Sequence, residues 1–187
     1  MTVEDGLNAE HAPPFPGSIR AAIPHPAGGR VVMSGFPGLE TTVDGMAVFD
    51  PVACRETLLG LRELGAATLC VLIESDELDA EFLPSLEALA GEVGLDVAHF
   101  PIVDYAAPTQ TRAQQWATTA QARAQSFAAG ATLAFACQYG AGRSGTMAAR
   151  CLIEGGMTPE AAIARVREHF SEAIESKAQE DWLMSGK

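Results

Sequence analysis

The residues best suited to chemistry lie in one short segment, between an apolar run and a helical pattern. Cys137 and Arg143 are separated by five residues, Gln138, Tyr139, Gly140, Ala141 and Gly142. In a curled glycine-rich loop, backbone N–H groups point inward, the next helix adds a positive dipole, and a guanidinium can hold two oxygens. The segment therefore predicts a site for an oxyanion with several negative oxygens. The same field favours Cys137 as a thiolate, which is the nucleophilic form.

The elements around this loop alternate between strands and helices. Apolar patterns predict strands at residues 30–34, 68–73, 97–103 and 131–136. Capping signals and helical periodicity predict helices at 50–65, 111–129, 143–154, from Thr158 and from Ser176, and broken helical segments over 75–92. This alternation indicates an α/β fold with a mainly parallel sheet. Ligands of such sheets bind at the carboxyl ends of the strands, which is where Cys137 falls.

Composition narrows the class of protein. The chain has 187 residues, 48% of them hydrophobic, and a formal net charge of −12, and its pI is near 4.6. We expect an extended lead-in over residues 1–29 and a single α/β domain over residues 30–187. The acidic balance argues against nucleic acid or an anionic membrane as a partner. A polar, acidic N-terminus and the lack of an apolar run of ~20 residues favour a soluble cytoplasmic protein of undetermined oligomeric state.

The spacing of cysteines and histidines does not match that of a metal site or a disulfide-bonded domain. Four cysteines are scattered without a CxxC pair, and the four histidines show no metal-ligand spacing. We therefore expect no metal and no other cofactor, and a reducing compartment. Cys70 and Cys151 are expected to be core residues. A reversible disulfide between either of them and Cys137 is left open.

The loop from Cys137 to Arg143 resembles the signature loop of cysteine-dependent protein tyrosine phosphatases. The compact dual-specificity type and the kinase-associated phosphatase group match best, over roughly residues 30–183. The resemblance implies a four- to five-stranded sheet flanked by helices, with the signature loop between a central strand and a helix. It also implies metal-free hydrolysis of phosphate monoesters through a cysteinyl-phosphate intermediate.

The resemblance assigns roles within the loop. Cys137 would attack phosphorus, and Arg143 would clamp two phosphoryl oxygens and stabilise the transition state. The backbone N–H groups of residues 138–143 would form the phosphate cradle. The Ser144 hydroxyl would donate to the Cys137 sulfur and help it to leave. The alternative for Ser144 is a simple helix N-cap.

Two candidates lie outside the loop. Asp104 follows Phe100-Pro101-Ile102-Val103 and precedes Cys137 by 33 residues, much like the family's general acid. The alternative is an ordinary turn aspartate. Gln179, with residues 173–176, resembles a family segment that supplies a glutamine to orient the hydrolytic water. Ser176 and Gln179 also fit a capping box equally well.

Ala136 departs from the family pattern, in which a histidine before the nucleophile supports the loop and favours the thiolate. His25 or His99 could replace it in space. This departure keeps a second function in view, a binding module for phospho-ligands or other oxyanions with weak turnover. A third alternative is a rhodanese-like sulfurtransferase or an arsenate reductase, which also use a cysteine in an anion-binding loop.

Substrate expectations follow from charge. Phosphotyrosine in a protein is the first expectation, and a small phosphate monoester is the alternative. Residues 138–142 contain no lysine, which disfavours multiply phosphorylated headgroups. The acidic cluster Glu74, Asp76 and Glu77 is interpreted as a solvated helix start.

Overall fold

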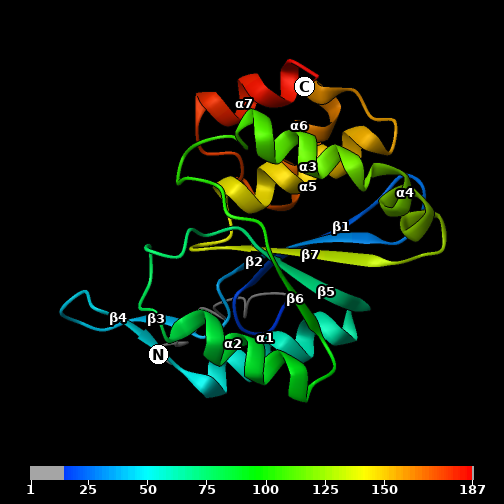
Figure 1. Ribbon diagram of the computed structural model, residues 1–187. Coiled ribbons are helices and arrows are strands. Elements are labelled where there is room, and N and C mark those ends of the chain that lie inside the picture. The colour runs from blue at the N-terminus through cyan, green and yellow to red at the C-terminus, as the bar shows by residue number, and fades with distance from the viewer. Residues whose placement is uncertain (1–14, 187) are drawn as a thin grey trace, which may run out of the picture.

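A five-stranded sheet forms the centre of the computed structural model, which describes residues 15–186 (Figure 1). The strands, in spatial order, are β1 (Ile19–Pro24), β2 (Arg30–Gly35), β7 (Thr132–Cys137), β5 (Ala66–Val71) and β6 (Asp96–His99). Only β1 runs antiparallel to its neighbour; the pairs β2–β7, β7–β5 and β5–β6 are parallel. The expected mainly parallel α/β sheet is confirmed, with β7 at its centre.

Helices cover both faces of the sheet (Figure 1). One face carries α1 (Pro51–Glu63) and α2 (Phe82–Glu92). The other face carries α3 (Gln110–Thr118), α4 (Ala120–Ala128), α5 (Gly142–Glu154), α6 (Pro159–His169) and α7 (Lys177–Met184). Among the described residues, no helix has both the length and the apolar character needed to span a membrane.

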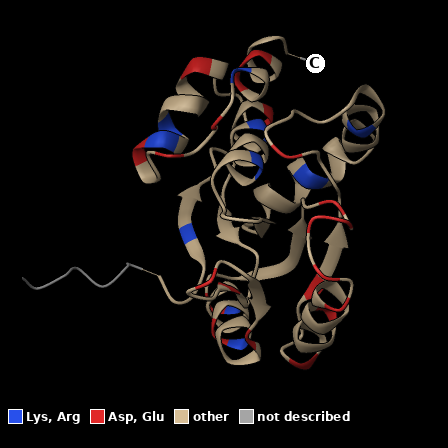
Figure 2. Cartoon of the chain, turned by 90° about the vertical axis from the view of Figure 1, so that its left-hand side faces the viewer, with Lys and Arg blue, Asp and Glu red and all other residues tan. Residues whose placement is uncertain are grey.

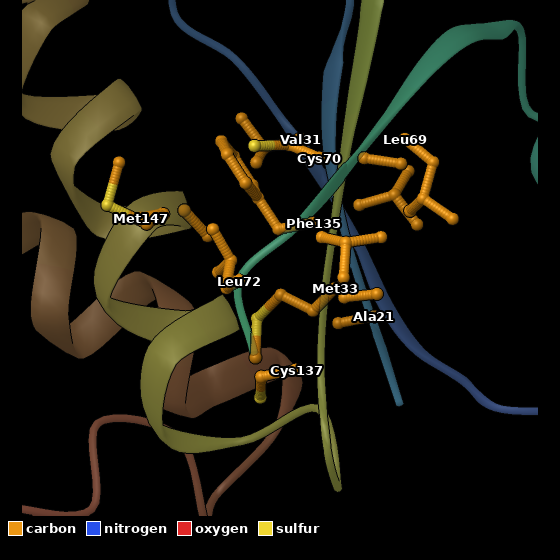
Figure 3. Packing of buried hydrophobic residues seen from close by; sticks show 14 of the residues in the cluster. Ala21, Val31, Met33, Leu69, Cys70, Leu72, Phe135, Cys137 and Met147 are labelled. Carbon is orange, nitrogen blue, oxygen red and sulfur yellow. The ribbon is translucent and has the colours of Figure 1, made fainter. Parts of the chain in front are cut away.

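The central strand is deeply buried. Ala134, Phe135 and Ala136 of β7 are inaccessible to solvent, as expected for a strand with helices on both sides. Met147, on the first turns of α5, is equally buried and joins the same apolar cluster (Figure 3). Phe135 and Met147 each contribute about 1.5–3 kcal/mol by leaving water. This packing fixes the strand end at which Cys137 lies.

The predicted lead-in is wrong for residues 15–29. These residues include β1, an edge strand whose Ile19, Ala21 and Ile23 are buried against the sheet. Alternating apolar residues form the strand, although the surrounding prolines suggested irregular structure. Residues 1–14 lie outside the described part of the chain.

Other boundaries differ for local reasons. The helix predicted over 111–129 is two helices, and Thr119 between them donates its hydroxyl to the Trp116 carbonyl. The helical segment predicted from residue 75 begins only at Phe82, so Pro84 lies in the first turn of α2, where proline is tolerated. The ambiguous residues 41–48 belong to a hairpin of β3 (Leu39–Thr41) and β4 (Ala47–Phe49).

Candidate active site

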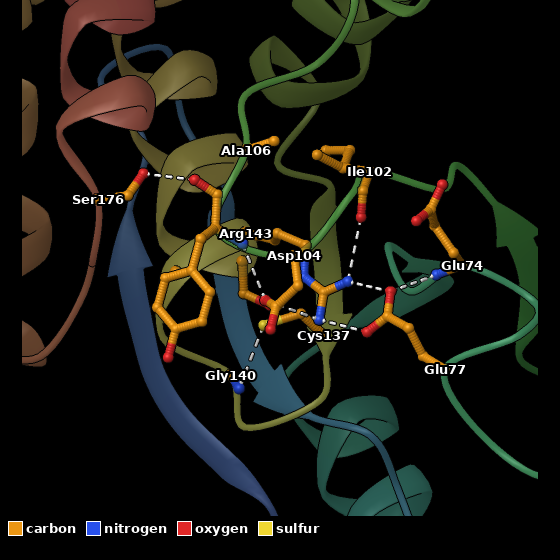
Figure 4. Close-up of polar contacts among 12 residues, drawn as sticks. Glu74, Glu77, Ile102, Asp104, Ala106, Cys137, Gly140, Arg143 and Ser176 are labelled. Atoms are coloured by element: carbon orange, nitrogen blue, oxygen red, sulfur yellow. Dashed lines mark hydrogen bonds and ion pairs between the residues drawn. The ribbon is translucent and has the colours of Figure 1, made fainter.

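The loop after β7 brings a cysteine sulfur to the start of a helix. Cys137 ends β7 beside Gly35 of β2, and α5 begins five residues later at Gly142. The Gly140 N–H donates to the Cys137 Sγ over 3.2 Å (Figure 4). The sulfur thus lies next to a backbone donor and close to the start of α5.

Two glycines allow the loop to curl this tightly. Gly140 has a φ of 99°, and a Cβ on it would lie 2.5 Å from the Gly35 nitrogen. A Cβ on Gly142 would lie 2.2 Å from the Oε2 of Glu175. A side chain is therefore excluded at Gly140, whereas at Gly142 it would meet the flexible ends of Glu175 and Gln179.

Arg143 is buried beneath the loop, with only 2% of its surface exposed. Its Nη1 and Nη2 bind the two carboxylate oxygens of Glu77 over 2.5 and 2.9 Å. Nη1 also donates to the Ile102 carbonyl over 3.0 Å, and Nη2 lies 3.2 Å from Asp104 Oδ1 (Figure 4). Burial alone would lower the pKa of the guanidinium, but the Glu77 hydrogen bonds and the charges of Cys137, Glu77 and Asp104 raise it overall.

One donor of this guanidinium is unused. Arginine carries five N–H groups in a rigid plane, and Nε of Arg143 is buried without a hydrogen-bond partner among residues 15–186. Glu77 occupies the end formed by Nη1 and Nη2. On the remaining edge Nη2 lies 3.2 Å from Asp104 Oδ1, so Nε is the donor left for an oxyanion oxygen. The arrangement therefore suits an oxyanion bound beside Cys137.

Asp104 reaches the site from the loop after β6. Its Oδ1 accepts from the Tyr105 N–H over 3.0 Å and pairs with Arg143 as described above. The loop is held from α7, since the Ser176 hydroxyl donates to the Tyr105 carbonyl over 2.6 Å. The side chain of Asp104 is 46% exposed, so it can exchange protons with solvent. The structure thus brings Asp104, Cys137 and Arg143 to one edge of the sheet.

Gln179 serves as a cap and also lies at the loop. Ser176 and Gln179 make both hydrogen bonds of a capping box. The Nε2 of Gln179 donates to the Ala106 carbonyl over 3.4 Å and lies 3.1 Å from the place a Cβ on Gly142 would take. The two interpretations made from the sequence are therefore compatible, and the water-orienting role stays a prediction.

Ser144 does not make the contact expected of it. Its hydroxyl donates to the Ser34 carbonyl over 3.3 Å, because the end of β2 lies directly beneath the first turn of α5. The simple N-cap alternative is wrong, since Ser144 lies inside α5 and Ala141 is the N-cap residue. Donation to the Cys137 sulfur would require the hydroxyl to leave Ser34.

Two residues of the site escaped sequence reasoning. Glu77, expected to be solvated, is the bidentate partner of Arg143 and also accepts from the Glu74 N–H over 2.7 Å. Its position after β5, at the same sheet edge as Cys137, was the available signal. Arg20, within the predicted lead-in, donates from Nε to the Tyr139 carbonyl over 2.9 Å.

Neither histidine replaces the one missing at position 136. His25 follows β1 at the opposite edge of the sheet, where it bonds the Cys151 carbonyl and stacks on Phe127. His99 bonds the Ile73 carbonyl over 2.8 Å.

The other cysteines are core residues, as expected. Burial raises the pKa of Cys54 and of Cys70 to about 12, and it raises that of Cys151 as well. Cys70 pairs with Phe135 in the neighbouring strand, and Cys151 lies towards the far end of α5. All four cysteines are free thiols.

Solved structures that resemble this fold include proteins described as phosphatases. A kinase associated phosphatase, with serine in place of its catalytic cysteine, has a TM-score of 0.72 and 20% identity over 92% of this chain and 95% of that one. Tk-PTP in its active form has a TM-score of 0.63 and 23% identity over 90% and 97% of the two chains. PTPMT1 has a TM-score of 0.62 and 18% identity over 88% and 92%, and it has also been crystallised with PI(5)P. At these identities the likeness shows the fold.

The family follows from the sequence match. Residues 45–157, more than half of the chain, match the family described as Tc-R-P, the DSP-PTPase phosphatase of polymorphic toxin systems. The chain belongs to this family. It is thus a phosphatase of the dual-specificity protein tyrosine phosphatase type, which hydrolyses phosphate monoesters. No curated protein matches the sequence. The sulfurtransferase and arsenate-reductase alternatives find no support in the family match.

Proposed function

We propose that Cys137, Arg143 and Asp104 carry out the hydrolysis, through a cysteinyl-phosphate intermediate and without a metal. The observation that carries the proposal is their convergence at one sheet edge, with the Nε of buried Arg143 unpartnered there. Loop N–H groups and the Nε of Arg143 would bind the phosphoryl oxygens. Glu77 would keep the guanidinium in place, because it holds the opposite end.

The reaction has two steps. The Cys137 thiolate attacks phosphorus and the bond to the leaving oxygen breaks, while Asp104 gives its proton to that oxygen. Water then attacks the phosphocysteine and loses a proton to Asp104, which releases inorganic phosphate and the thiolate. In this second step Gln179 would orient the water. The Ser144 hydroxyl would turn from Ser34 to the departing sulfur.

Phosphotyrosine in a protein is the substrate that we propose. A lipid headgroup, as in PTPMT1 with PI(5)P, is the natural comparison. Against it, residues 138–142 offer no lysine, and carboxylates rather than ammonium groups surround the loop. We propose that the enzyme acts in cytoplasm, where a reducing environment keeps Cys137 as a thiol.

The test compares three proteins in hydrolysis of p-nitrophenyl phosphate in EDTA. Cys137→Ser should abolish turnover yet still bind tungstate. Asp104→Asn should lower kcat by about 10²–10⁴-fold, as loss of a general acid does. Asp96→Asn is the matched control, since Asp96 lies at the start of β6 and should be silent.

Three outcomes would overturn the proposal. Loss of activity in EDTA would show that a metal takes part. Wild-type protein that binds tungstate but releases no phosphate between pH 5 and 8 would support the binding-module alternative, which the alanine at position 136 favours. Equal losses in Asp104→Asn and Asp96→Asn would remove Asp104 as the acid.

A further inference from the structure

A short segment between α6 and α7 borders the phosphate loop. The Ile174 N–H donates to the Ala141 carbonyl over 3.4 Å. A Cβ on Gly145 would lie 2.9 Å from the Ala173 Cβ, so the two chains are in close contact. Arg167 donates to the carbonyls of Ala173 and Ile174 over 3.2 and 3.0 Å. The backbone of this segment is thereby fixed against the loop.

Two carboxylates of this segment point to the loop. The Glu175 carboxylate lies against Gly142 in the proposed phosphate cradle, with its Oε2 2.2 Å from the place a Cβ on that glycine would take. Interaction with the Glu172 carboxylate raises the pKa of the Tyr139 hydroxyl, which places the two groups close together. Both residues are exposed to solvent. Together with Asp104 they form what we call the acidic rim: Asp104, Glu172 and Glu175.

The cations near this rim are already engaged. Arg143 is held by Glu77 and buried. The Arg20 guanidinium lies 4.6 Å from the centre of the Tyr139 ring, and its Nε is bonded to the Tyr139 carbonyl. Arg167 is engaged too, by the Ala173 and Ile174 carbonyls and by Glu180. Figure 2 shows acidic residues on loops and at helix ends, and the whole chain has 24 acidic and 12 basic residues.

An anionic substrate is attracted by one part of this site and repelled by another. The unpartnered Nε of Arg143, which is 98% buried, indicates an anion below, whereas the exposed rim above repels one. Glu175 and a bound phosphate would also share the surroundings of the Gly142 N–H. A positive group on the substrate, next to its phosphate, would relieve this repulsion by pairing with the rim.

We propose that the acidic rim selects phosphopeptide segments with lysine or arginine beside the phosphorylated residue. This inference rests on the proposed function, because it concerns the substrate of the same site. Exposed pairs are individually weak and sensitive to salt. With two or three such pairs, we expect about a 10-fold preference at low salt for an arginine-flanked over an aspartate-flanked peptide.

The experiment uses three phosphotyrosine peptides that differ only in the flanking residues: arginine, alanine or aspartate. The kcat/KM of each peptide is measured on the full chain at low and high salt. p-Nitrophenyl phosphate, which has no flanking residues, is the reference substrate. Glu172→Gln/Glu175→Gln is the test variant. Glu63→Gln/Glu87→Gln removes the same charge from exposed residues of α1 and α2, which cover the other face of the sheet.

The rim variant should change two substrates in opposite directions. Its kcat/KM should fall for the arginine peptide and rise for the aspartate peptide, a result that general damage to the enzyme does not produce. The wild-type preference should shrink at high salt, and the control variant should keep it. If the protein hydrolyses p-nitrophenyl phosphate but has the same kcat/KM for all three peptides, the proposed role of the acidic rim is wrong and the proposed function stands. A protein that hydrolyses none of these substrates would overturn the proposed function and the rim with it.

Discussion

The ion pair between Glu77 and Arg143 offers the sharpest test of the site's construction. Glu77 accepts two charge-assisted hydrogen bonds from a guanidinium that is 2% exposed, and its own side chain is 17% exposed. Removing one partner of a fully buried pair costs about 3–5 kcal/mol. In Glu77→Ala, Asp104 and the Ile102 carbonyl still bind Arg143. We therefore expect the free energy of unfolding to fall by about 2–3 kcal/mol. At about 2–4 °C per kcal/mol, Tm should fall by about 4–12 °C.

The same substitution should slow catalysis in the protein that remains folded. Without Glu77 the guanidinium turns towards Asp104, and its Nε leaves the position that suits a phosphate. Misplacement of a positioned group by about 1 Å can cost about 100-fold, and we expect a loss of about 10- to 100-fold in kcat/KM. Glu77→Gln keeps one acceptor and should lie between wild type and Glu77→Ala.

Steady-state hydrolysis of p-nitrophenyl phosphate, measured well below each Tm, separates folding from catalysis. Glu92→Ala is the matched control, since it breaks the exposed Arg55–Glu92 pair, whose side chains are 46% and 54% exposed. That change should cost at most about 1 kcal/mol and leave kcat/KM unchanged. If Glu77→Ala keeps kcat/KM within about twofold of wild type, then Glu77 does not position Arg143 for catalysis.

Three further predictions concern other parts of the site. Iodoacetamide near neutral pH should alkylate Cys137 alone, because burial raises the pKa of Cys54, Cys70 and Cys151; intact mass should show one adduct, and none in Cys137→Ser. Burial, with the charge of Asp104, raises the pKa of Glu175, so its ionisation destabilises the folded state as pH rises through that pKa. Glu175→Gln should therefore have a higher Tm than wild type at pH 7, with the difference disappearing below about pH 4; a constant difference would contradict this. Gly140→Ala should lower Tm and phosphate binding together, because a Cβ there would lie 2.5 Å from the Gly35 nitrogen, whereas Gly156→Ala, at a similar φ of 100° with no atom within 4 Å, controls for backbone strain.

The local features of the site could be predicted from the sequence. Cys137, the loop glycines and Arg143 lie within seven consecutive positions, so their geometry depends mostly on one turn between a strand and a helix. Asp104 required one more rule, that the ends of neighbouring parallel strands meet at one edge. The same rule applied to β5 would have placed Glu77 there too. A charge cluster after a strand was instead interpreted as solvated surface.

Contacts that depend on tertiary packing could not be predicted from sequence patterns. Arg20 lies in an edge strand whose alternation is short and flanked by proline, and its partner Tyr139 is 119 positions away. The Ser144 hydroxyl meets a carbonyl of β2 that only the strand order places beneath α5. Thr119 separates α3 from α4, whose Phe127 stacks on His25 across 102 positions of sequence.

Ala136 changes which groups support the loop. Its position in β7 lies opposite Ser34 of β2 and Val71 of β5, while His25 and His99 bond the carbonyls of Cys151 and Ile73. On the β2 side, the Ser34 hydroxyl donates to the Gly35 carbonyl over 2.7 Å, and Ser144 donates to the Ser34 carbonyl. These bonds fix the strand end that pairs with Cys137. The sulfur itself depends on the Gly140 N–H, the start of α5 and the Arg143 charge, all of which act from the loop. Support that a side chain on β7 gives in the resembled family therefore comes here from β2 and from the loop backbone.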